Sequence, residues 1–310
     1  MTTDISVIVP FLNEEDNIND LCKVLDEYAK DKEYKLEIVF VDDGSTDRSV
    51  ILLKQYNFKY TKAKIVTLSR NFGSHAAIRA GVLKASSDIC VFFSADLQEP
   101  VSLIGTVYNK LQEGYDVVCI QKREVQVSFS EKLFSRGYAK LVRKYAVKNF
   151  PLGGVNNIMF NKKVKDVLNR YIESNSSIFL QIMNMGFRMS IVDMDYNARN
   201  KGETKWTLDK KIKMLIDSFV AFSFFPIRLV SILGIIMSLL GLLFAFGILI
   251  IKLFNLLPLE LGYPTLITVI LFGFGVTNIS LGVIAEYLWR AYDSARGRAV
   301  FIINDEITIN

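Results

Sequence analysis

The chain has 310 residues, of which 51% are hydrophobic and 22% are charged, and it carries a formal net charge of +5. The charged fraction excludes a chain wholly embedded in a membrane, and the 22 Phe and 13 Tyr, which require burial, exclude a disordered or fibrous chain. The hydrophobic fraction still exceeds the roughly 45–50% of an ordinary soluble domain.

The charge is distributed unevenly along the chain. Residues 1–121 contain 13 basic and 18 acidic side chains, a net charge of −5, and residues 122–225 contain 19 and 9, a net charge of +10. The charges balance in residues 226–289, with two of each sign, and in residues 290–310, with three of each. We expect these four segments to be the domains of the protein.

Residues 1–121 have the pattern of an alternating α/β domain. Strands are predicted where short runs are rich in Val, Ile and Phe and nearly continuous in hydrophobicity, as in strands buried on both faces. The predicted strands are Ile5–Pro10, Glu37–Val41, Lys64–Leu68, Ile89–Phe93 and Asp116–Ile120. Helix-length segments such as Glu14–Lys30 and Gly73–Ala85 lie between them. The alternation predicts a mostly parallel, doubly wound sheet, in which ligands bind beyond the carboxyl ends of the strands.

Polar side chains follow four of these predicted strands. They are Asn13, Glu14 and Glu15 after the first strand, Asp42 and Asp43 after the second, Ser69, Arg70 and Asn71 after the third, and Asp96 and Gln98 after the fourth. So many carboxylates at one edge require a cation, and oxygen ligands without His or Cys favour Mg²⁺ or Mn²⁺. The segment Asp42–Ser45, taken alone, is also typical of a turn with a helix cap.

The sequence contains neither a GxxxxGK[ST] loop nor a GxGxxG fingerprint, so it supports neither a P-loop nor a dinucleotide site. We therefore expect a nucleotide that is held through a divalent metal. The only histidine, His75, lies at the start of a predicted helix. His75 could cap the helix, pack in the core or contact a ligand, and the sequence does not decide between these roles.

Four segments, in this order and spacing, resemble the inverting family 2 glycosyltransferases of GT-A fold. They are Val9–Glu15 (VPFLNEE), Val41–Asp47 (VDDGSTD), Leu68–Gly73 (LSRNFG) and Ala95–Pro100 (ADLQEP). Two more, Arg199–Lys205 (RNKGETK) and Phe222–Arg228 (FSFFPIR), resemble the polyisoprenyl-phosphate branch, which includes dolichyl-phosphate mannose synthase and bactoprenol glucosyltransferase. The resemblance covers essentially the whole chain and implies a Rossmann-like, mostly parallel GT-A domain that uses a nucleotide sugar.

The resemblance also implies a role for each matching residue. The expected donor-binding residues are Pro10, Asn13, Glu15, Asp42, Asp43, Arg70 and Asp96. Asp96 and Gln98 would bind the metal, which neutralises the leaving nucleoside diphosphate. Arg199 and Lys205 would lie on a mobile arm that closes over the phosphates. The expected catalytic residues are Asp96, Arg199, Lys205 and the residue at position 156.

Two positions depart from the family pattern. Ser94 stands where many relatives have Asp, and Asn156 stands at the position of the family's proposed catalytic base. Asn cannot accept a proton in that role. A lipid phosphate monoester, with a second pKa of about 6, is largely a dianion at pH 7 and needs positioning rather than deprotonation, whereas an alcohol acceptor needs a general base. Asn156 therefore favours a phosphate acceptor, and it equally permits an inactive relative.

Residues 122–225 are expected to bind the acceptor and the membrane interface. A basic stripe recurs every four residues on a predicted helix within residues 122–148, next to an apolar face. The stripe is Lys132, Arg136, Lys140, Lys144 and Lys148, and the apolar face is Phe134, Tyr138, Leu141, Val142 and Tyr145. The pattern is typical of an interfacial helix on anionic lipids, and a solvated helix packed on the core is the alternative. Trp206–Phe225 resembles a second such helix, and by resemblance Arg123 and Arg136 would contact the acceptor phosphate.

Residues 226–289 are expected to form a transmembrane hairpin. Ser231–Ile251 and Thr265–Ala285 are uncharged runs of 21 residues, each long enough for a helix of roughly 30 Å. Basic residues flank the outer ends of both runs, so by the positive-inside rule both flanks and both termini are cytoplasmic. Residues 290–310 would then form a cytoplasmic tail.

These observations predict a multi-pass enzyme of the cell inner (plasma) membrane. It would transfer a hexose, with glucose as the first expectation, from a nucleotide sugar to undecaprenyl or another polyprenyl phosphate with inversion. Membrane lipids are expected partners, nucleic acid is not, and a homo-oligomer is left open. Two alternatives also stay open: a glycosyltransferase with a hydroxyl acceptor, and a non-catalytic, membrane-anchored partner that binds a nucleotide sugar.

Overall fold

The computed structural model describes residues 3–122, 129–148, 150–151, 153–155, 157–174, 176–194, 219–254 and 263–309. The chain divides into two compact units. The first is Met1–Ser218 together with Arg298–Asn310, and the second is Phe219–Gly297. The C-terminal residues thus return to the unit that contains the N-terminus.

The first unit alternates strands and helices as predicted. Its elements are β1 (Ile5–Phe11), α1 (Glu15–Ala29), β2 (Leu36–Asp42), α2 (Ser49–Gln55), β3 (Lys62–Leu68), α3 (Ser74–Lys84), β4 (Ile89–Phe92), α4 (Leu103–Gln112), β5 (Val117–Lys122), α5 (Phe129–Tyr145), β6 (Asn157–Phe160), α6 (Lys162–Arg170), α7 (Ile178–Asn184), β7 (Met189–Met194) and β8 (Ile303–Ile309). All five strands predicted for residues 1–121 are confirmed, as are the two helices named with them.

The described strands form one sheet in the order β7-β5-β6-β4-β1-β2-β3-β8. The neighbours β4, β1, β2 and β3 are parallel, and so are β5 and β7. The strand β6 runs antiparallel to β4 and β5, and β8 runs antiparallel to β3. The mostly parallel α/β sheet is therefore confirmed, with the carboxyl ends of four adjacent strands at one edge.

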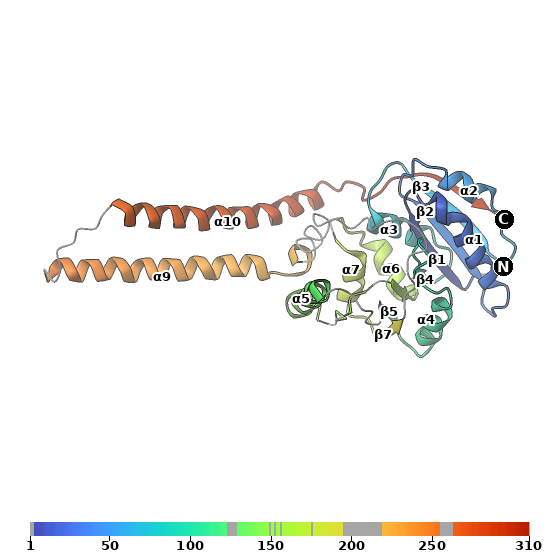
Figure 1. The fold of residues 1–310 in the computed structure, drawn as a ribbon, viewed down its shortest axis with the longest axis horizontal. Helices are drawn as coiled ribbons and strands as arrows, with labels where there is room; N and C mark the ends of the chain where they lie inside the picture. The colour runs from blue at the N-terminus through green and yellow to red at the C-terminus, as the bar shows by residue number, and fades with distance from the viewer. Residues whose placement is uncertain are drawn as a thin grey trace. The chain divides into compact units, whose positions relative to one another are not determined.

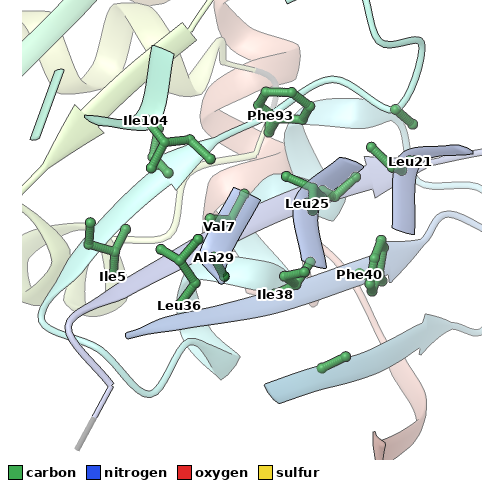
Figure 2. Packing of buried hydrophobic residues seen from close by; sticks show 14 of the residues in the cluster. Ile5, Val7, Leu21, Leu25, Ala29, Leu36, Ile38, Phe40, Phe93 and Ile104 are labelled. Carbon is green, nitrogen blue, oxygen red and sulfur yellow. The ribbon is translucent and has the colours of Figure 1, made fainter. Parts of the chain in front are cut away.

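Helix α1 packs on the sheet through one face. Leu21, Leu25 and Ala29 are buried and recur every four residues, so they lie on the same side of the helix. Figure 2 shows this face directed toward Val7 of β1 and Ile38 of β2, which belong to the same buried cluster. Burying a Leu or Ile side chain contributes about 1.5–3 kcal/mol, so this contact fixes β1 and β2 and the loops that follow them.

The segment 290–310 contributes a strand that the sequence did not predict. β8 pairs along β3 and closes that edge of the sheet. Glu306 of β8 forms ion pairs with Lys84, at 2.6 Å, and with Lys64, at 3.5 Å. The end of the chain is thus held on the first unit.

The basic helix α5 ends at Tyr145, so Lys148 lies beyond it. Its described side chains from residue 139 include buried Ala139 and Val142 and exposed Lys140, Leu141, Arg143 and Lys144. Leu141 was expected on the apolar face, but it is 43% exposed. The side chains of Lys132 and Arg136 lie outside the described part of the structure. Of the basic stripe, Lys140 and Lys144 lie exposed on α5 as predicted, next to a narrower buried face, and the prediction that Lys148 continues the stripe on this helix is wrong.

The second unit contains two long helices, α9 (Phe225–Leu253) and α10 (Tyr263–Ala295), which lie side by side (Figure 1). Among the described residues, one stretch is long and apolar enough to cross a membrane, Phe225–Ile248 in α9, with a mean hydropathy of 2.6. In its most apolar 18-residue window, none of the described side chains is buried within the protein, unlike those of the core helix of a soluble domain. The second span, predicted at 265–285 within α10, is not among the stretches found and stays a prediction.

Candidate functional site

The carboxyl ends of β4, β1, β2 and β3 lie next to one another because these strands are parallel neighbours. The loops that follow them carry most of the residues predicted from the sequence. Those residues are Pro10 at the end of β1 and Asn13, Glu15, Asp42, Asp43, Arg70, Asp96 and Gln98 around the same edge. The structure therefore brings this part of the predicted site together.

Reciprocal hydrogen bonds join the loop after β1 to the loop after β2. Asn13, whose φ of +52° is left-handed, accepts the backbone N–H of Thr46 on its Oδ1 at 2.9 Å. The Asn13 N–H donates to Ser45 Oγ at 3.0 Å. Glu15 Oε2 accepts the backbone N–H of Arg48 at 3.1 Å. Both side chains brace the loop after β2, and their predicted contact with a donor stays a prediction.

Asp42 and Asp43 are both buried, but they hold different loops. Asp42 Oδ1 accepts the backbone N–H of Ser45 at 2.8 Å, within its own loop. Asp43 Oδ1 accepts the N–H of Phe72 at 2.7 Å, and its Oδ2 accepts the N–H of Gly73 at 3.0 Å. Burial raises the pKa of Asp43, and the Asp42 charge adds to this, while the two N–H donors oppose it. The hydrogen bond from Ser45 to Asp42 is thus the turn that the alternative interpretation of this segment expects.

Gly44 allows the loops after β2 and β3 to approach each other. Its φ of +80° is in the left-handed region. A Cβ at this position would lie 2.7 Å from the carbonyl carbon of Arg70 and 2.8 Å from the nitrogen of Asn71. Only glycine fits between these backbone atoms.

Arg70 presents an exposed cation at this edge. Its guanidinium carbon lies 4.1 Å from the ring centroid of Phe72, and its Nη1 donates to the carbonyl of Asn71 at 3.1 Å. The preceding residue, Ser69, donates its N–H to the carbonyl of Ile302, just before β8, at 3.0 Å. The C-terminal segment therefore supports the loop that carries Arg70.

Asp96 and Gln98 lie in a tight loop after β4. The Gln98 N–H donates to Asp96 Oδ1 at 3.3 Å, and Leu97 between them has a left-handed φ of +54°. The described residues contain no group of three or more His, Cys, Asp and Glu side chains that could hold a metal by themselves. One carboxylate and one amide oxygen still fit a Mg²⁺ or Mn²⁺ ion that takes its other ligands from phosphates and water.

Beside this loop lies a buried pair of residues, Glu99 and Asn157, that the sequence did not predict. Glu99 is 3% exposed, and its Oε2 accepts the backbone N–H of Ser94 at 3.3 Å and the side-chain N–H of Asn157. Asn157 is 2% exposed and is the first residue of β6. No signal in the sequence pairs them, because Glu99 stands in a polar loop and β6 has only four residues.

Four predicted functional residues, Arg123, Asn156, Arg199 and Lys205, lie outside the described residues. Of Arg136, only the backbone position within α5 is described. The predicted helix Trp206–Phe225 also lies mostly outside the described residues. The roles that the resemblance implies for them stay predictions.

His75 is a packing residue. Its ring meets that of Phe179 edge-on with the centroids 5.6 Å apart, and in the described part of the chain its buried Nδ1 has no hydrogen-bond partner. Burial, together with the nearby Arg79 cation, lowers the pKa of His75 to about 4. Arg79 is itself buried and donates to Ser176 Oγ at 2.9 Å and Gln181 Oε1 at 3.0 Å. These bonds tie α3, which follows the Arg70 loop, to α7 and the residues before it.

Sequence comparison supplies the family. The profile of glycosyl transferase family 2 matches residues 6–194. A Bacillus subtilis protein named uncharacterized glycosyltransferase YkcC is 33% identical over 96% of this chain and 92% of its own length. An undecaprenyl-phosphate 4-deoxy-4-formamido-L-arabinose transferase of Proteus mirabilis is 26% identical over 98% of this chain and 94% of its own length.

Among solved structures, the mannosyltransferase PcManGT from Pyrobaculum calidifontis, in complex with GDP-Man and Mn²⁺, has a similar fold. Its TM-score is 0.51 at 18% sequence identity, over 71% of this chain and 64% of that one. This likeness bears on the fold alone. From the match of the family profile and the extent of the sequence identity, we conclude that the chain belongs to glycosyltransferase family 2 and is a glycosyltransferase of GT-A fold.

Proposed function

We propose that this glycosyltransferase transfers a sugar from a nucleotide-sugar donor to undecaprenyl phosphate, or to another polyprenyl phosphate, with inversion at the anomeric carbon. The observation that most supports the proposal is the extent of the match to the Proteus mirabilis undecaprenyl-phosphate transferase. That match covers 98% of this chain, so it includes the apolar unit as well as the GT-A unit.

We assign donor binding to the loops after β1, β2, β3 and β4. Asp96 and Gln98 are the residues that would hold Mg²⁺ or Mn²⁺, and such a cation neutralises the leaving nucleoside diphosphate when bound. Arg70 supplies an exposed positive charge at the same edge. Asp43 acts on the donor through loop shape, because both of its carboxylate oxygens accept backbone N–H groups.

A phosphate acceptor suits the chemistry of this chain. The residue at the family's proposed base position is Asn156, and an amide does not accept a proton near pH 7. The second pKa of a phosphate monoester is about 6, so at neutral pH this acceptor attacks without a general base. The protein's task is then to bring the phosphate to the anomeric carbon and to exclude water.

The acceptor is a lipid, and we assign the second unit to the membrane. α9 exposes its apolar side chains, and α5 exposes Lys140, Arg143 and Lys144, which suit an anionic leaflet. The chain leaves the GT-A unit before Phe219 and rejoins it through β8, which shares a sheet with β3. Residues on both sides of the apolar unit are therefore on one side of the membrane, so the unit crosses an even number of times. We infer a hairpin of α9 and α10 with both termini cytoplasmic.

Labelling of intact cells tests this topology. We expect a membrane-impermeant maleimide to modify the Glu260→Cys variant in intact cells, and the Arg298→Cys variant only after lysis. The buried Cys22, Cys90 and Cys119 are the background, which the unmodified protein measures. Modification of both variants only after lysis would contradict the hairpin.

The activity is tested with the full-length protein in detergent. We expect a lipid-linked sugar to form from one of a panel of labelled UDP- and GDP-sugars with undecaprenyl phosphate, and EDTA to abolish its formation. The matched control is undecaprenol, which differs only in lacking the phosphate. Product from undecaprenol would favour a hydroxyl acceptor. Failure of every donor with undecaprenyl phosphate would overturn the proposal and favour a non-catalytic, donor-binding partner.

A further inference from the structure

A single buried carboxylate joins the loop after β4 to strand β6. Among the described residues, Glu99 Oε2 accepts hydrogen bonds from the backbone N–H of Ser94 and from Nδ2 of Asn157. Glu99 is 3% exposed and Asn157 is 2% exposed, so neither side chain is solvated in place of these bonds. Removing one partner would leave a buried polar group unsatisfied, which is costly.

The first of these bonds closes the loop on itself. Ser94 and Glu99 stand at its two ends, and Asp96 and Gln98 lie between them. The turn is tight, because Leu97 has a φ of +54° and the Gln98 N–H reaches back to Asp96 Oδ1. The Glu99 carboxylate therefore determines how far apart the two ends of this loop lie.

The second bond fixes the loop to β6. Because β6 runs antiparallel to β4 and β5, its first residue, Asn157, lies at the edge formed by the carboxyl ends of those strands. The opposite end of β6 is followed by Asn161, whose Nδ2 donates to Asp116 Oδ1 at 2.8 Å. The strand is thus held at each end by an asparagine-to-carboxylate hydrogen bond, and only the first touches the loop of Asp96.

We propose that Glu99 and Asn157 are positioning residues for the metal and the donor diphosphate. Their hydrogen bond holds the loop of Asp96 and Gln98 in the conformation that binds the metal, and it fixes the position of this loop relative to β6. Asn157 is covalently next to position 156, so the same bond links the metal loop to the part of the chain expected to meet the acceptor. This inference rests on the metal-binding role proposed above for Asp96 and Gln98.

Exchanging the polar groups of the pair tests the proposal in the full-length protein. Asn157→Asp places two carboxylates in contact, and we expect it to weaken the Mn²⁺-dependent affinity for UDP or GDP at least tenfold, about 1.4 kcal/mol. Glu99→Gln can place its amide oxygen where Oε2 lies and keep both hydrogen bonds, so we expect its affinity to fall less than that of Asn157→Asp. In the double variant, the amide nitrogen introduced at position 99 takes the place of Oε2 and donates to the carboxylate introduced at position 157. That nitrogen cannot also accept the Ser94 N–H, so we expect only part of the affinity to return.

Two measurements separate positioning from a general loss of structure. Amide hydrogen exchange of the metal-free protein should show faster exchange at Ser94 in Asn157→Asp than in the unmodified protein, because repulsion between the two carboxylates displaces the acceptor of the Ser94 N–H. The matched control, Asn161→Asp, makes the same change at the other end of β6. It should lower thermal stability while leaving both the nucleotide affinity and the Ser94 exchange unchanged.

The outcomes distinguish this inference from the proposed function. If the unmodified protein binds neither UDP nor GDP with Mn²⁺, the donor proposal fails and this inference fails with it. If it binds one of them and Asn157→Asp binds equally well, only the positioning role is wrong. Equal weakening by Asn157→Asp and Asn161→Asp, without recovery in the double variant, would also overturn it, because the effect would then be structural.

Discussion

The carboxylate of Asp43 bridges two loops of the site, with its Oδ2 3.0 Å from the backbone nitrogen of Gly73 and its Oδ1 2.7 Å from that of Phe72. Asp42, the preceding residue, bonds instead to Ser45 within its own loop. Asp42 and Asp43 are adjacent and chemically identical, but they hold different loops. We therefore expect substitutions at the two positions to have different effects on stability.

Asp43→Asn should destabilise the protein. An amide offers one acceptor oxygen where the carboxylate offers two, so one of the two hydrogen bonds is lost. The Gly73 N–H keeps a second acceptor, Asn71 Oδ1 at 3.0 Å, so the cost is that of one hydrogen bond, about 0.5–1.5 kcal/mol. We expect the thermal unfolding midpoint to fall by several degrees. Asp42→Asn is the matched control, since its amide oxygen can still accept the Ser45 N–H, and its midpoint should hardly move while donor affinity falls. Equal stability of both variants would show that the Asp43 bridge is unimportant.

Gly44→Ala should disrupt the contact between the loops after β2 and β3. The added Cβ would lie 2.7 Å from the Arg70 carbonyl carbon, and neither backbone can yield without moving the loop. Gly186→Ala is the control, because Gly186 has a similar φ of +77° and no atom within 4 Å of the added Cβ. That variant carries only the left-handed strain of about 1–2 kcal/mol. We expect a larger fall in the unfolding midpoint for Gly44→Ala, and weaker nucleotide binding in that variant alone. Identical effects of the two substitutions would refute a close approach.

Asp96→Ala should abolish metal-dependent turnover while the protein stays folded in the membrane. Loss of a ligand to a cation that stabilises the leaving group by several kcal/mol corresponds to a fall in kcat of about 100-fold or more. The control is Asp88→Ala, at the other end of β4, where the exposed carboxylate pairs with Lys162 at 2.9 Å. Turnover and its Mn²⁺ dependence should be unchanged in this control. Retained turnover in Asp96→Ala would remove Asp96 from the metal site.

The central strands could be predicted from the sequence because each is buried on both faces and reads as a continuous apolar run. Because strands and helices alternate along the chain, the strands are parallel and their carboxyl ends lie at one edge of the sheet. The polar residues that follow Val41 and Phe92 must therefore lie at that edge, which gives the position of Asp42 and Asp96. The sequence did not show that Asn13 and Glu15 brace the neighbouring loop, because those bonds depend on how closely the loops approach.

Strand β8 and the Glu99–Asn157 pair could not be predicted, for the same physical reason. β8 carries Asp305 and Glu306 in its middle, which breaks the apolar run of a buried strand. β8 pairs with β3, and its Glu306 forms an ion pair with Lys84. Both partners come from a distant part of the chain. The stabilisation of both features thus comes from long-range contacts, which local patterning does not record.

Acid should destabilise the folded protein through His75. The folded protein holds this imidazole neutral, with a pKa of about 4, through burial and the Arg79 charge, whereas an exposed histidine titrates near 6.5. Below pH 6.5 the unfolded chain binds a proton that the folded chain excludes, so stability falls as the pH drops from about 6.5 to about 4. Between pH 7.5 and pH 5 this single group should lower the free energy of unfolding by about 2 kcal/mol.

The His75→Phe variant tests this expectation. Phe fills the same space beside Phe179 and cannot titrate, and the variant shares every other titratable group with the unmodified protein. The thermal unfolding midpoint of the variant should therefore fall less between pH 7.5 and pH 5 than that of the unmodified protein. Parallel pH dependence of the two would mean that His75 gains a proton without unfolding, and that its site is open to water.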